Sequence, residues 1–565
     1  MHKPTIEPRH SIYYDYKIYP YHHPPELDGE KHKHPVVLVG AGPVGMVAAL
    51  ELASFGVRSV LLESERQVSL GSRAICFTRR SMEILQQAGI DKPLTAAGLP
   101  WRYGNSYYRG QRTFRLDMPH DEDDRFHPML NLQQQYLEEY LVDAVSRQPL
   151  IDLRWGHHVT DVVRNDGISA TLRVDTEDGP YEIGADWVVA TDGARSGVRG
   201  LLGLTMQGDS YEGRFVIADI RVDLDLPTER LAFFDPPWNP GNTVLMHREP
   251  HGIWRIDFQL PPGETPEQAL ALESLAPRID AQLALIGKAG AKWELDWSSV
   301  YSARAMTLTD YRAGRILFSG DAGHMLPIFG VRGANTGWQD CQNLAWKLAF
   351  VIKGLAPDRI LRSYSEERVG AAWEIIDEAS KSTRFMAPPS HGFRLLRDAA
   401  LSLSLTQEFV RPLYHWRTSR PHEYTNSNLN AAQDDNGKFT RGPRNGAQLD
   451  NIKLGEDNYL LDHAGAAFQL ICFGARIPED VRSEVQTLRA SGLPLQLIAV
   501  VPASGPEAVD GADLTLRDAS GHFYAKYSAP EGAAYLARPD QHVCARWLKA
   551  DGQRVAAAIK TALAQ

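Results

Sequence analysis

Short runs of consecutive apolar residues indicate where strands are buried on both faces of a sheet. Residues 36–39 (VVLV) form such a run, without the polar alternation of a strand that has one solvated face. The run leads into a glycine-rich turn at residues 40–45, a helical stretch to about Phe55, and a second apolar strand at residues 59–63. This order predicts a βαβ unit, in which a helix connects two parallel strands.

Two later apolar runs extend the same pattern. Residues 187–190 lead into Asp192-Gly193, and residues 316–318 lead into Gly320-Asp321. Each run is short, apolar throughout and followed by a turn, as expected of a core strand. We therefore expect these strands and the first βαβ unit to form one sheet.

The segment between these two runs has a different pattern. It alternates apolar and polar positions over three stretches, 215–223, 243–246 and 252–260. Such alternation predicts a sheet with one face on a core and the other face on solvent or a ligand. This insert is the predicted substrate domain, of α+β character.

Helical periodicity dominates the chain after Gly337. It runs to Lys353 and returns at residues 360–380 and 393–405. Residues 426–446, rich in Asn, Asp, Gly and Arg, then give the strongest linker signal, and a separate α/β unit follows them.

These patterns predict an α/β protein built on a Rossmann-like dinucleotide-binding domain. At roughly 100–200 residues per domain, its length allows three or four domains. The expected divisions are an N-terminal arm (1–34), a discontinuous cofactor domain (35–105, 130–200 and 301–355), a substrate domain (106–129 and 201–300), a helical connector (356–425), the linker (426–446) and a C-terminal unit (447–565).

Composition narrows the classes of function. The 565 residues are 43% hydrophobic and 23% charged, close to the averages for globular proteins. Sixty Lys and Arg against seventy Asp and Glu give a net charge of −10, which argues against a nucleic acid partner. The four cysteines have neither a CxxC pair nor metal-ligand spacing. We therefore expect no disulfide framework, no metal site and a reducing cytoplasm.

The N-terminal region contains six histidines and five tyrosines in its first 34 residues. No regular spacing gathers the imidazoles around a metal, and no apolar core of a signal peptide is present. The apolar residues 36–57 are interrupted by glycines, Pro43 and Glu51, so we expect no membrane span. The arm is expected to pack along the folded body.

The glycine turn carries the first chemical signal. Gly40, Gly42 and Gly45 have the spacing that allows a tight turn and lets the backbone approach a pyrophosphate at a helix N-terminus. Glu63 ends the second strand, where its carboxylate can accept hydrogen bonds from an adenosine ribose. Together these features predict a dinucleotide site, and they fit NAD as well as FAD.

Two later motifs indicate which dinucleotide is bound. Residues 190–199 (ATDGARSGVR) and 320–324 (GDAGH), followed by Pro327 and residues 330–337 (GVRGANTG), resemble the second and third fingerprints of a known family. That family is the class A FAD-dependent aromatic hydroxylases, which includes phenol hydroxylase and p-hydroxybenzoate hydroxylase. With the glycine turn, the resemblance covers residues 36 to about 353. It implies FAD as cofactor and NAD(P)H as co-substrate.

The resemblance and simple electrostatics assign roles to these motifs. Asp321, after a buried strand, can accept a hydrogen bond from a flavin ribityl hydroxyl, and the amides of loop 330–337 favour negative charge on a reduced flavin ring. Arg73 and Arg332 are implied as catalytic charges at the flavin edge, and Arg73 also as a pyrophosphate contact. The register among three consecutive glutamines at 133–135 stays open. The implied cofactor contacts are Gly40, Gly42, Pro43, Val44, Gly45, Glu63, Ser64, Arg73, Gln134, Asp192, Gly193, Gly320, Asp321, Gly330, Gly333, Ala334 and Asn335.

Candidate substrate contacts are His247, Arg255, Asp257 and Pro327. A pocket with a few polar anchors among apolar and aromatic side chains suits a phenol, and the insert also supplies such aromatics, namely Phe233, Phe234, Trp238 and Trp254. Strand alternation places Arg255 and Asp257 on the face opposite Trp254, so only one of the two sets can face a ligand.

The C-terminal unit resembles the thioredoxin-like tail of phenol hydroxylase relatives, through residues 468–474 and 535–547. Because it lacks a CxxC pair, redox exchange has no paired thiols. The resemblance implies packing on the body or on a partner subunit, which leaves a homodimer open.

The function implied by the resemblance is hydroxylation of a phenolic ring, ortho to an existing hydroxyl, with FAD, NAD(P)H and O2 through a C4a-hydroperoxyflavin. The partners are then a small aromatic substrate and O2. Alternatives are a larger polycyclic or heteroaromatic substrate, oxygen insertion beside a carbonyl, and an FAD-binding scaffold without turnover. The Trp-x-Trp-x-Ile-Pro motif of flavin halogenases and the paired cysteines of disulfide reductases are absent from the sequence.

Overall fold

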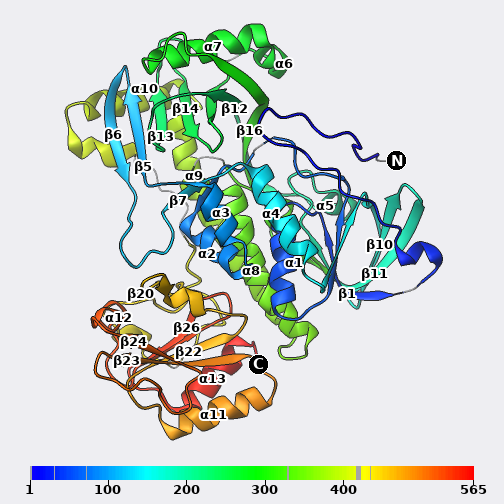
Figure 1. Cartoon of the computed structure of the whole chain (residues 1–565), viewed down its shortest axis with the longest axis vertical. Coiled ribbons are helices and arrows are strands. Elements are labelled where there is room, and N and C mark those ends of the chain that lie inside the picture. Colours follow the sequence, from blue (N-terminus) through cyan, green and yellow to red (C-terminus); the bar gives the residue numbers. More distant parts are fainter. Residues whose placement is uncertain are drawn as a thin grey trace.

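The computed structural model describes residues 3–30, 32–71, 73–261, 263–327, 330–414, 421–432 and 434–565. Figure 1 shows the sheet of the predicted substrate domain (the substrate sheet) at the top, the predicted cofactor domain (the cofactor body) in the middle and the C-terminal unit at the bottom. Within the described ranges, no helix combines the length and the apolar character that crossing a bilayer requires.

The apolar runs at 36–39, 187–190 and 316–318 lie in one sheet, as their pattern predicts. Val36 pairs with Trp187 and Val188 with Ile316, and all of these neighbouring strands are parallel. The path through the sheet is β17 (Arg312–Ala313), β18 (Ile316–Phe318), β11 (Gly179–Ala190), β1 (Lys33–Val39), β2 (Ser59–Glu63) and β8 (Ile151–Trp155), with β10 (Ala170–Thr176) and β9 (His158–Asn165) added through β11. The cofactor domain is therefore a Rossmann-like sheet in which β18, β11, β1, β2 and β8 are parallel and β17, β10 and β9 are added antiparallel.

Helices pack against this sheet beside the first strand. The helix α1 (Pro43–Ser54) starts with Pro at its first turn and buries every residue from Gly45 to Ala53. It packs against the long helix α8 (Gly333–Ile352), which is buried over most of its length. The other helices of this body are α2 (Arg79–Gln87), α3 (Asp91–Ala97), α4 (Gln134–Ser146) and α5 (Gly197–Leu201), and a small sheet joins β3 (Cys76–Thr78), β7 (Met129–Asn131) and β4 (Leu99–Trp101).

The predicted insert forms an eight-stranded sheet that also takes in strands from outside the segment 201–300. Its order is β19 (His324–Met325), β16 (Trp293–Thr307), β12 (Gln207–Val222), β15 (Ile253–Gln259), β14 (Thr243–Arg248), β13 (Arg230–Phe234), β5 (Tyr103–Tyr108) and β6 (Gln111–Asp117). On one face, Trp254 and Ile256 pack in a core with α7 (Leu272–Leu285), which follows the short helix α6 (Pro266–Leu270). Arg255 and Asp257 therefore lie on the other face, which is turned toward the cofactor body.

Two helices connect the body to the C-terminal unit. The expected helices at 360–380 and 393–405 are α9 (Ile360–Met386) and α10 (His391–Ser404), and α9 continues further than its pattern indicates. The polar stretch 426–446 is not a free spacer. Its backbone bonds to β26 (Val543–Trp547), where Ala431 N–H donates to Cys544 O over 2.8 Å and Gly446 N–H donates to Val543 O over 2.7 Å.

The C-terminal unit is a five-stranded sheet with helices α11 (Glu479–Ala490), α12 (His522–Tyr527) and α13 (Gly552–Ala562). Its strands run in the order β24 (Leu514–Asp518), β23 (Leu495–Pro502), β22 (Phe468–Phe473), β25 (Ala534–Ala537) and β26, preceded by the hairpin of β20 (Lys453–Gly455) and β21 (Asn458–Tyr459). β22 is parallel to β23 and antiparallel to β25. The thioredoxin-like assignment stays a prediction from resemblance.

A buried charge network ties this unit to α8 and α9. Lys347 Nζ donates to Glu367 Oε2 over 2.7 Å, and Arg538 donates to Glu367 Oε1 over 2.7 Å and to Asp540 Oδ2 over 2.6 Å. All four side chains are almost completely buried. Breaking such a network by removing one member is strongly destabilising, because it leaves an uncompensated buried charge.

Candidate active site

The three glycines of the first motif have different geometric roles. A Cβ at Gly40, where φ is +99°, would lie 2.7 Å from Thr191 O, and a Cβ at Gly45 would lie 1.9 Å from Gly40 O. A Cβ at Gly42 would meet nothing within 4 Å. Gly40 and Gly45 are thus required for close packing, whereas Gly42 leaves open space in front of the N-terminus of α1, which Pro43 and Val44 begin. That space suits a pyrophosphate.

Glu63 is held by the same turn. Its Oε2 accepts a hydrogen bond from Ala41 N–H over 2.8 Å, while Oε1 accepts from Glu65 N–H over 3.0 Å and from the Ser64 hydroxyl over 3.2 Å. Burial raises the pKa of Glu63, and the backbone hydrogen bonds oppose that shift. Each carboxylate oxygen keeps acceptor capacity for a ribose hydroxyl, and Ser64 serves to orient the carboxylate.

The second motif shapes a turn beside the glycine loop. Asp192 accepts from the Ser196 hydroxyl over 2.6 Å and from Val198 N–H over 3.1 Å, which fixes the start of α5, and Gly193 follows with φ +76°. Arg199 donates to Ala322 O over 3.0 Å, so it links the second motif to the third rather than lying free on the surface. Arg195, by contrast, is exposed.

Asp321 presents an unused carboxylate. Its side chain is exposed and makes no hydrogen bond with the described residues, yet protein packed around it raises its pKa by desolvation, against the charges of His324 and Arg73. The preceding Gly320 has φ +62°. An exposed carboxylate with free acceptor capacity fits a ribityl hydroxyl.

Sequence reasoning missed the group that supports Asp321. Asp340 of α8 accepts from Gly320 N–H over 3.0 Å, contacts His324 Nε2 at 2.7 Å and accepts from Arg368 Nε over 2.5 Å. The sequence signal that could have revealed this group is the presence of charged residues within the otherwise apolar faces of α8 and α9. This cluster holds the turn that presents Asp321.

The loop before α8 is built for close approach. Gly330 has φ +98°, Val331 has φ +60°, and a Cβ at Gly333 would meet nothing within 4 Å. Ala334, in the first turn, is half-buried, and Arg332 is buried, with its carbonyl accepting from Thr336 N–H. Pro327 is buried just before the loop. Open space at a helix N-terminus can receive the edge of a flat ring.

Asn335 has a different task from the expected one. Its Oδ1 accepts from Thr78 N–H over 2.9 Å and from the Ser81 hydroxyl over 2.5 Å, while its amide donates to Cys76 O and Val331 O. The side chain is therefore fully used in fixing α8 to β3 and α2, which leaves only its backbone for a cofactor.

The loop that carries Arg73 reaches both the cofactor body and the substrate sheet. The Arg73 guanidinium is exposed and forms no hydrogen bond with the described residues, and its carbonyl accepts from Arg255 over 3.4 Å. Ala74 N–H donates to Gln134 Oε1 over 2.9 Å, so the middle glutamine of the three contacts this loop. Ser72 lies outside the described residues.

The face of the substrate sheet that meets this loop is charged and buried. Arg255 donates to both carboxylate oxygens of Asp219, over 2.7 and 2.8 Å, and lies 3.7 Å from Glu249 Oε1. His247 Nε2 lies 4.0 Å from Asp257 Oδ2. Two acids, Asp219 of β12 and Glu249 just after β14, thus share the buried Arg255 of β15, an arrangement that the register of these strands produces.

Burial perturbs every titrating group of this cluster. Burial raises the pKa of Asp257 to about 7, despite the opposing charge of Arg255, and raises that of Glu249 well above its usual range. Burial and the nearby charges of Arg230 and Arg255 lower the pKa of His247 well below its usual range. At neutral pH, His247 is thus an uncharged imidazole beside a carboxyl that titrates in the physiological range.

An apolar wall adjoins the charged face. It consists of buried residues together with the half-buried Leu116 and Val331, the second of which belongs to loop 330–337. The buried members are Ile75, Cys76, Trp101, Met118 and Met129. An apolar wall with a few buried polar groups suits an aromatic ring that carries a hydroxyl.

Comparison with known proteins decides what this combination is. Residues 33–379 match the FAD-binding domain family. The chain belongs to this family of flavoprotein hydroxylases. The geometry described above also fits FAD. It includes the open turn at Gly42, the unused carboxylate of Asp321 and the open start of α8.

Two named relatives match this flavoprotein hydroxylase, one over most of its length and the other over about two thirds of it. It is 28% identical over 534 residues, 93% of each chain, to the 3-(3-hydroxy-phenyl)propionate/3-hydroxycinnamic acid hydroxylase of Escherichia coli K12. It is 30% identical over 381 residues to the protein of the same name from Comamonas testosteroni, covering 67% of this chain and 63% of that one.

Solved structures confirm the fold of the flavoprotein hydroxylase. The flavin-dependent monooxygenase PieE, in complex with FAD and substrate, matches with a TM-score of 0.75 at 22% identity, over 94% of this chain and 99% of that one. Aklavinone-11 hydroxylase with FAD and aklavinone also gives 0.75, at 23% identity, over 95% and 100%. The predictions of FAD and of a monooxygenase acting on an aromatic compound are confirmed, while the roles of individual site residues stay predictions.

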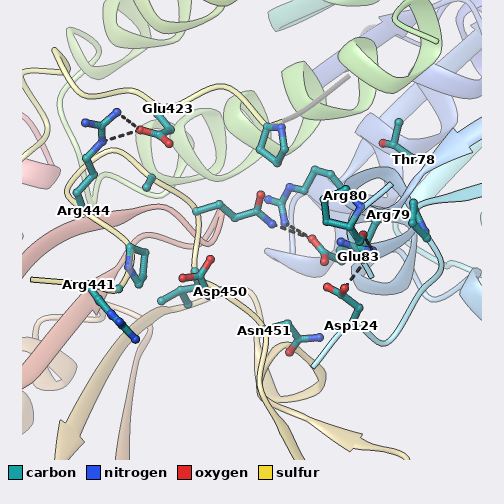
Figure 2. A pocket seen from close by; sticks show the side chains of 18 of the residues that line it. Thr78, Arg79, Arg80, Glu83, Asp124, Glu423, Arg441, Arg444, Asp450 and Asn451 are labelled. Carbon is teal, nitrogen blue, oxygen red and sulfur yellow. Dashed lines mark hydrogen bonds and ion pairs between the residues drawn. The ribbon is translucent and has the colours of Figure 1, made fainter. Parts of the chain in front are cut away.

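The flavoprotein hydroxylase also has a cavity of about 700 Å³ elsewhere, between α2 and the C-terminal unit. Figure 2 shows that its charged side chains mostly face one another: Arg79 pairs with Asp124 at 3.0 Å and Arg444 with Glu423 at 2.5 Å. Its described lining includes none of the expected cofactor or substrate residues. The cavity is a polar groove at a domain junction, and the residues that it shares with the candidate active site are Met118 and Met129 of the apolar wall.

Proposed function

We propose that this flavoprotein hydroxylase adds one oxygen atom to a phenolic ring, ortho to its hydroxyl, with NAD(P)H as reductant and O2 as oxidant. One oxygen atom enters the ring and the other leaves as water, with two electrons from NAD(P)H. The names of its relatives, hydroxylases of 3-(3-hydroxyphenyl)propionate and 3-hydroxycinnamic acid, suggest a phenol with an acidic side chain.

A single observation carries the choice of a phenol. His247 Nδ1 and Asp257 Oδ1 are both buried, and neither forms a hydrogen bond with the described residues. Buried polar atoms are almost always hydrogen-bonded in native proteins, so an unpartnered pair indicates a ligand that completes it. A phenol hydroxyl can donate to either atom while its ring lies along the wall formed by Trp101 and Met129.

FAD would be held by the glycine turn, Glu63, Asp321 and the start of α8. When bound, it supplies the oxidising chemistry, since flavin exchanges a hydride with NAD(P)H and reacts with O2. The exposed Arg73 and the amides of loop 330–337 would supply positive potential at the edge of the flavin ring. The apolar wall excludes water from the reacting carbon.

The phenol ring of the substrate is activated by the charged face of the substrate sheet. When Asp257, next to the neutral His247, accepts the phenol proton, negative charge spreads to the ring carbons ortho and para to the oxygen. Those carbons then become the nucleophiles. The ion pair of Arg255 with Asp219 fixes the strand on which Asp257 lies.

The test uses three ring compounds that differ in one feature. We expect 3-(3-hydroxyphenyl)propionate to accelerate NADH or NADPH oxidation and to yield a catechol that is heavier by one oxygen atom, labelled when ¹⁸O2 is supplied. The matched 3-phenylpropionate lacks the hydroxyl and should accelerate nothing, and phenol tests the need for the acidic chain. Absence of labelled catechol from every phenol tried, or labelling at a position other than ortho, would contradict the proposal.

A further inference from the structure

The N-terminal arm lies across the junction at which the cofactor body, α4 and the substrate sheet meet. Tyr19 N–H donates to Arg66 O over 2.7 Å, next to the loop that follows β2. The Ser11 hydroxyl and Ile12 N–H both donate to Asp296 of β16, over 2.7 and 2.6 Å. The arm, dark blue in Figure 1, thus bridges both parts of the candidate site.

Between these two anchors, a row of tyrosines enters the body. The Tyr136 hydroxyl of α4 donates to Tyr13 O over 3.0 Å, and the ring of Tyr136 stacks with His251, which follows β14, at a centroid distance of 4.8 Å. Tyr14 and Tyr16 are only 5% and 6% exposed. The tyrosine-rich composition of the arm therefore serves burial and hydrogen bonding.

The Tyr16 hydroxyl is bonded to the loop that carries Arg73. It donates to Ser69 O over 3.2 Å, and it accepts from Gly71 N–H over 3.1 Å and from Gln135 Nε2 over 3.3 Å. One hydroxyl thus uses its donor and both of its acceptor sites. Two of these bonds hold the loop within four residues of Arg73.

The rest of the loop is equally constrained. Ser69 N–H donates to Glu138 Oε2 over 2.7 Å. Gly71 has φ +70°, and a Cβ there would lie 2.3 Å from the indole of Trp297 on β16. Beyond Arg73, Ala74 N–H is bonded to Gln134. Arg73 is therefore an exposed residue of a loop that hydrogen bonds hold on both sides of it, and the arm supplies the bonds on one side.

We propose that Tyr16 is a positioning residue for Arg73, and that the N-terminal arm is in this way part of the FAD site. The inference rests on the proposed function in one respect, because it takes Arg73 as the charge that faces FAD. Loss of the Tyr16 hydroxyl leaves the Gly71 N–H and Ser69 carbonyl without their partner, which frees the loop to move. Arg73 then spends less time where its charge meets the cofactor.

The chain offers a matched control in Tyr14. It lies in the same arm, is buried to the same extent, and contacts Tyr16 edge-on at a centroid distance of 4.9 Å. Its hydroxyl has no hydrogen-bond partner among the described residues. Tyr14→Phe therefore changes the same kind of group without touching the loop.

The experiment measures FAD affinity of the full-length apoprotein by flavin fluorescence, with Tm recorded for each variant. We expect Tyr16→Phe to weaken FAD binding about two- to tenfold, the range to which a net hydrogen bond of about 0.5–1.5 kcal/mol converts. Tyr14→Phe should leave affinity unchanged. In an Arg73→Ala background, Tyr16→Phe should add little, because both substitutions act on one interaction.

Equal FAD affinity in Tyr16→Phe and Tyr14→Phe, or full additivity with Arg73→Ala, would overturn the inference. A lower Tm with unchanged affinity would also overturn it. If Tyr16→Phe fails to fold, Gln135→Leu, which removes the amide donor to the hydroxyls of Tyr16 and Tyr13, is judged by the same outcomes.

These affinity measurements need no substrate, so they remain decisive if no phenol proves to be hydroxylated. With a phenol that is hydroxylated, we expect Tyr16→Phe at saturating FAD to form less product per NAD(P)H consumed and more hydrogen peroxide. A wild-type ratio in that variant would count against the inference.

Discussion

Replacing Asp257 with Asn should remove the pH dependence of hydroxylation near neutrality. The ordinary pKa of this carboxyl, 3.8, is raised to about 7 by burial, with Arg255 opposing the shift and Asp219 adding to it. Only the ionised carboxylate can accept the phenol proton. In the wild type, kcat/KM should therefore fall by roughly tenfold for each pH unit well below about 7, because the ionised fraction of Asp257 shrinks in that proportion.

The size of the shift sets a second expectation, for stability. A shift of roughly three pH units corresponds to about 4 kcal/mol between the two protonation states of Asp257. Because its folded-state pKa is raised, the folded protein keeps this proton while the unfolded chain releases it. The contribution of Asp257 to the free energy of unfolding is thus fully present below about pH 4 and is lost as pH rises to about 7. In Asp257→Asn, the free energy of unfolding should not show this decline between about pH 4 and pH 7.

The assay follows product formation over pH 5.5–8.5 and urea unfolding over pH 4–7. Asp257→Asn should lower kcat/KM by about 10²–10⁴, the usual contribution of a positioned base, and flatten the profile. Glu249→Gln is the matched control, because Glu249 is an equally buried acid beside Arg255 whose pKa burial also raises, and its substitution leaves His247 and Asp257 in place. If kcat/KM of Asp257→Asn still declines below about pH 7 as in the wild type, the assignment of Asp257 as the base is wrong.

Three further predictions concern the cofactor, the thiols and the domain junction. Glu63→Ala and Asp321→Ala should each weaken FAD binding about three- to tenfold in a fluorescence titration, because each removes an acceptor for a cofactor hydroxyl; wild-type affinity in both would argue against these contacts. Cys472→Ala with Cys544→Ala should leave product per NAD(P)H unchanged, since burial raises both thiol pKa values to about 12; flavin reduction without hydroxylation in that variant would refute this. Arg538→Met should lower the free energy of unfolding by about 3–5 kcal/mol, measured with urea, because it leaves buried carboxylates uncompensated; a loss under 1 kcal/mol would show the network to be dispensable.

The cofactor half of the site could be predicted from the sequence because its signals are local. Gly40, Gly42 and Gly45 fall within six residues, and Glu63 follows at the end of the next strand. The geometry of a βαβ unit brings these groups together in any fold that contains it. The apolar runs likewise indicated strands that pair in one sheet.

The substrate half could not be predicted in the same way. Asp219 and Glu249 join Arg255 only through the register of antiparallel strands, which the alternation of apolar residues does not reveal. Strand alternation did separate Arg255 and Asp257 from Trp254, but it could not say which set faces the cofactor body. The sequence also does not reveal which partners a side chain bonds to. Asn335 lies in a cofactor motif, and yet its side chain bonds to β3 and α2.

The buried network of Lys347, Glu367, Arg538 and Asp540 also bears on how the protein is made and engineered. Arg538 and Asp540 leave the ribosome long after the helices that bear Lys347 and Glu367, so those helices cannot complete their packing until the C-terminal unit has been made. Transplanting the tail of a relative onto this body would also succeed only if both sides of the network were exchanged together. The junction therefore restricts which C-terminal units can be combined with this body.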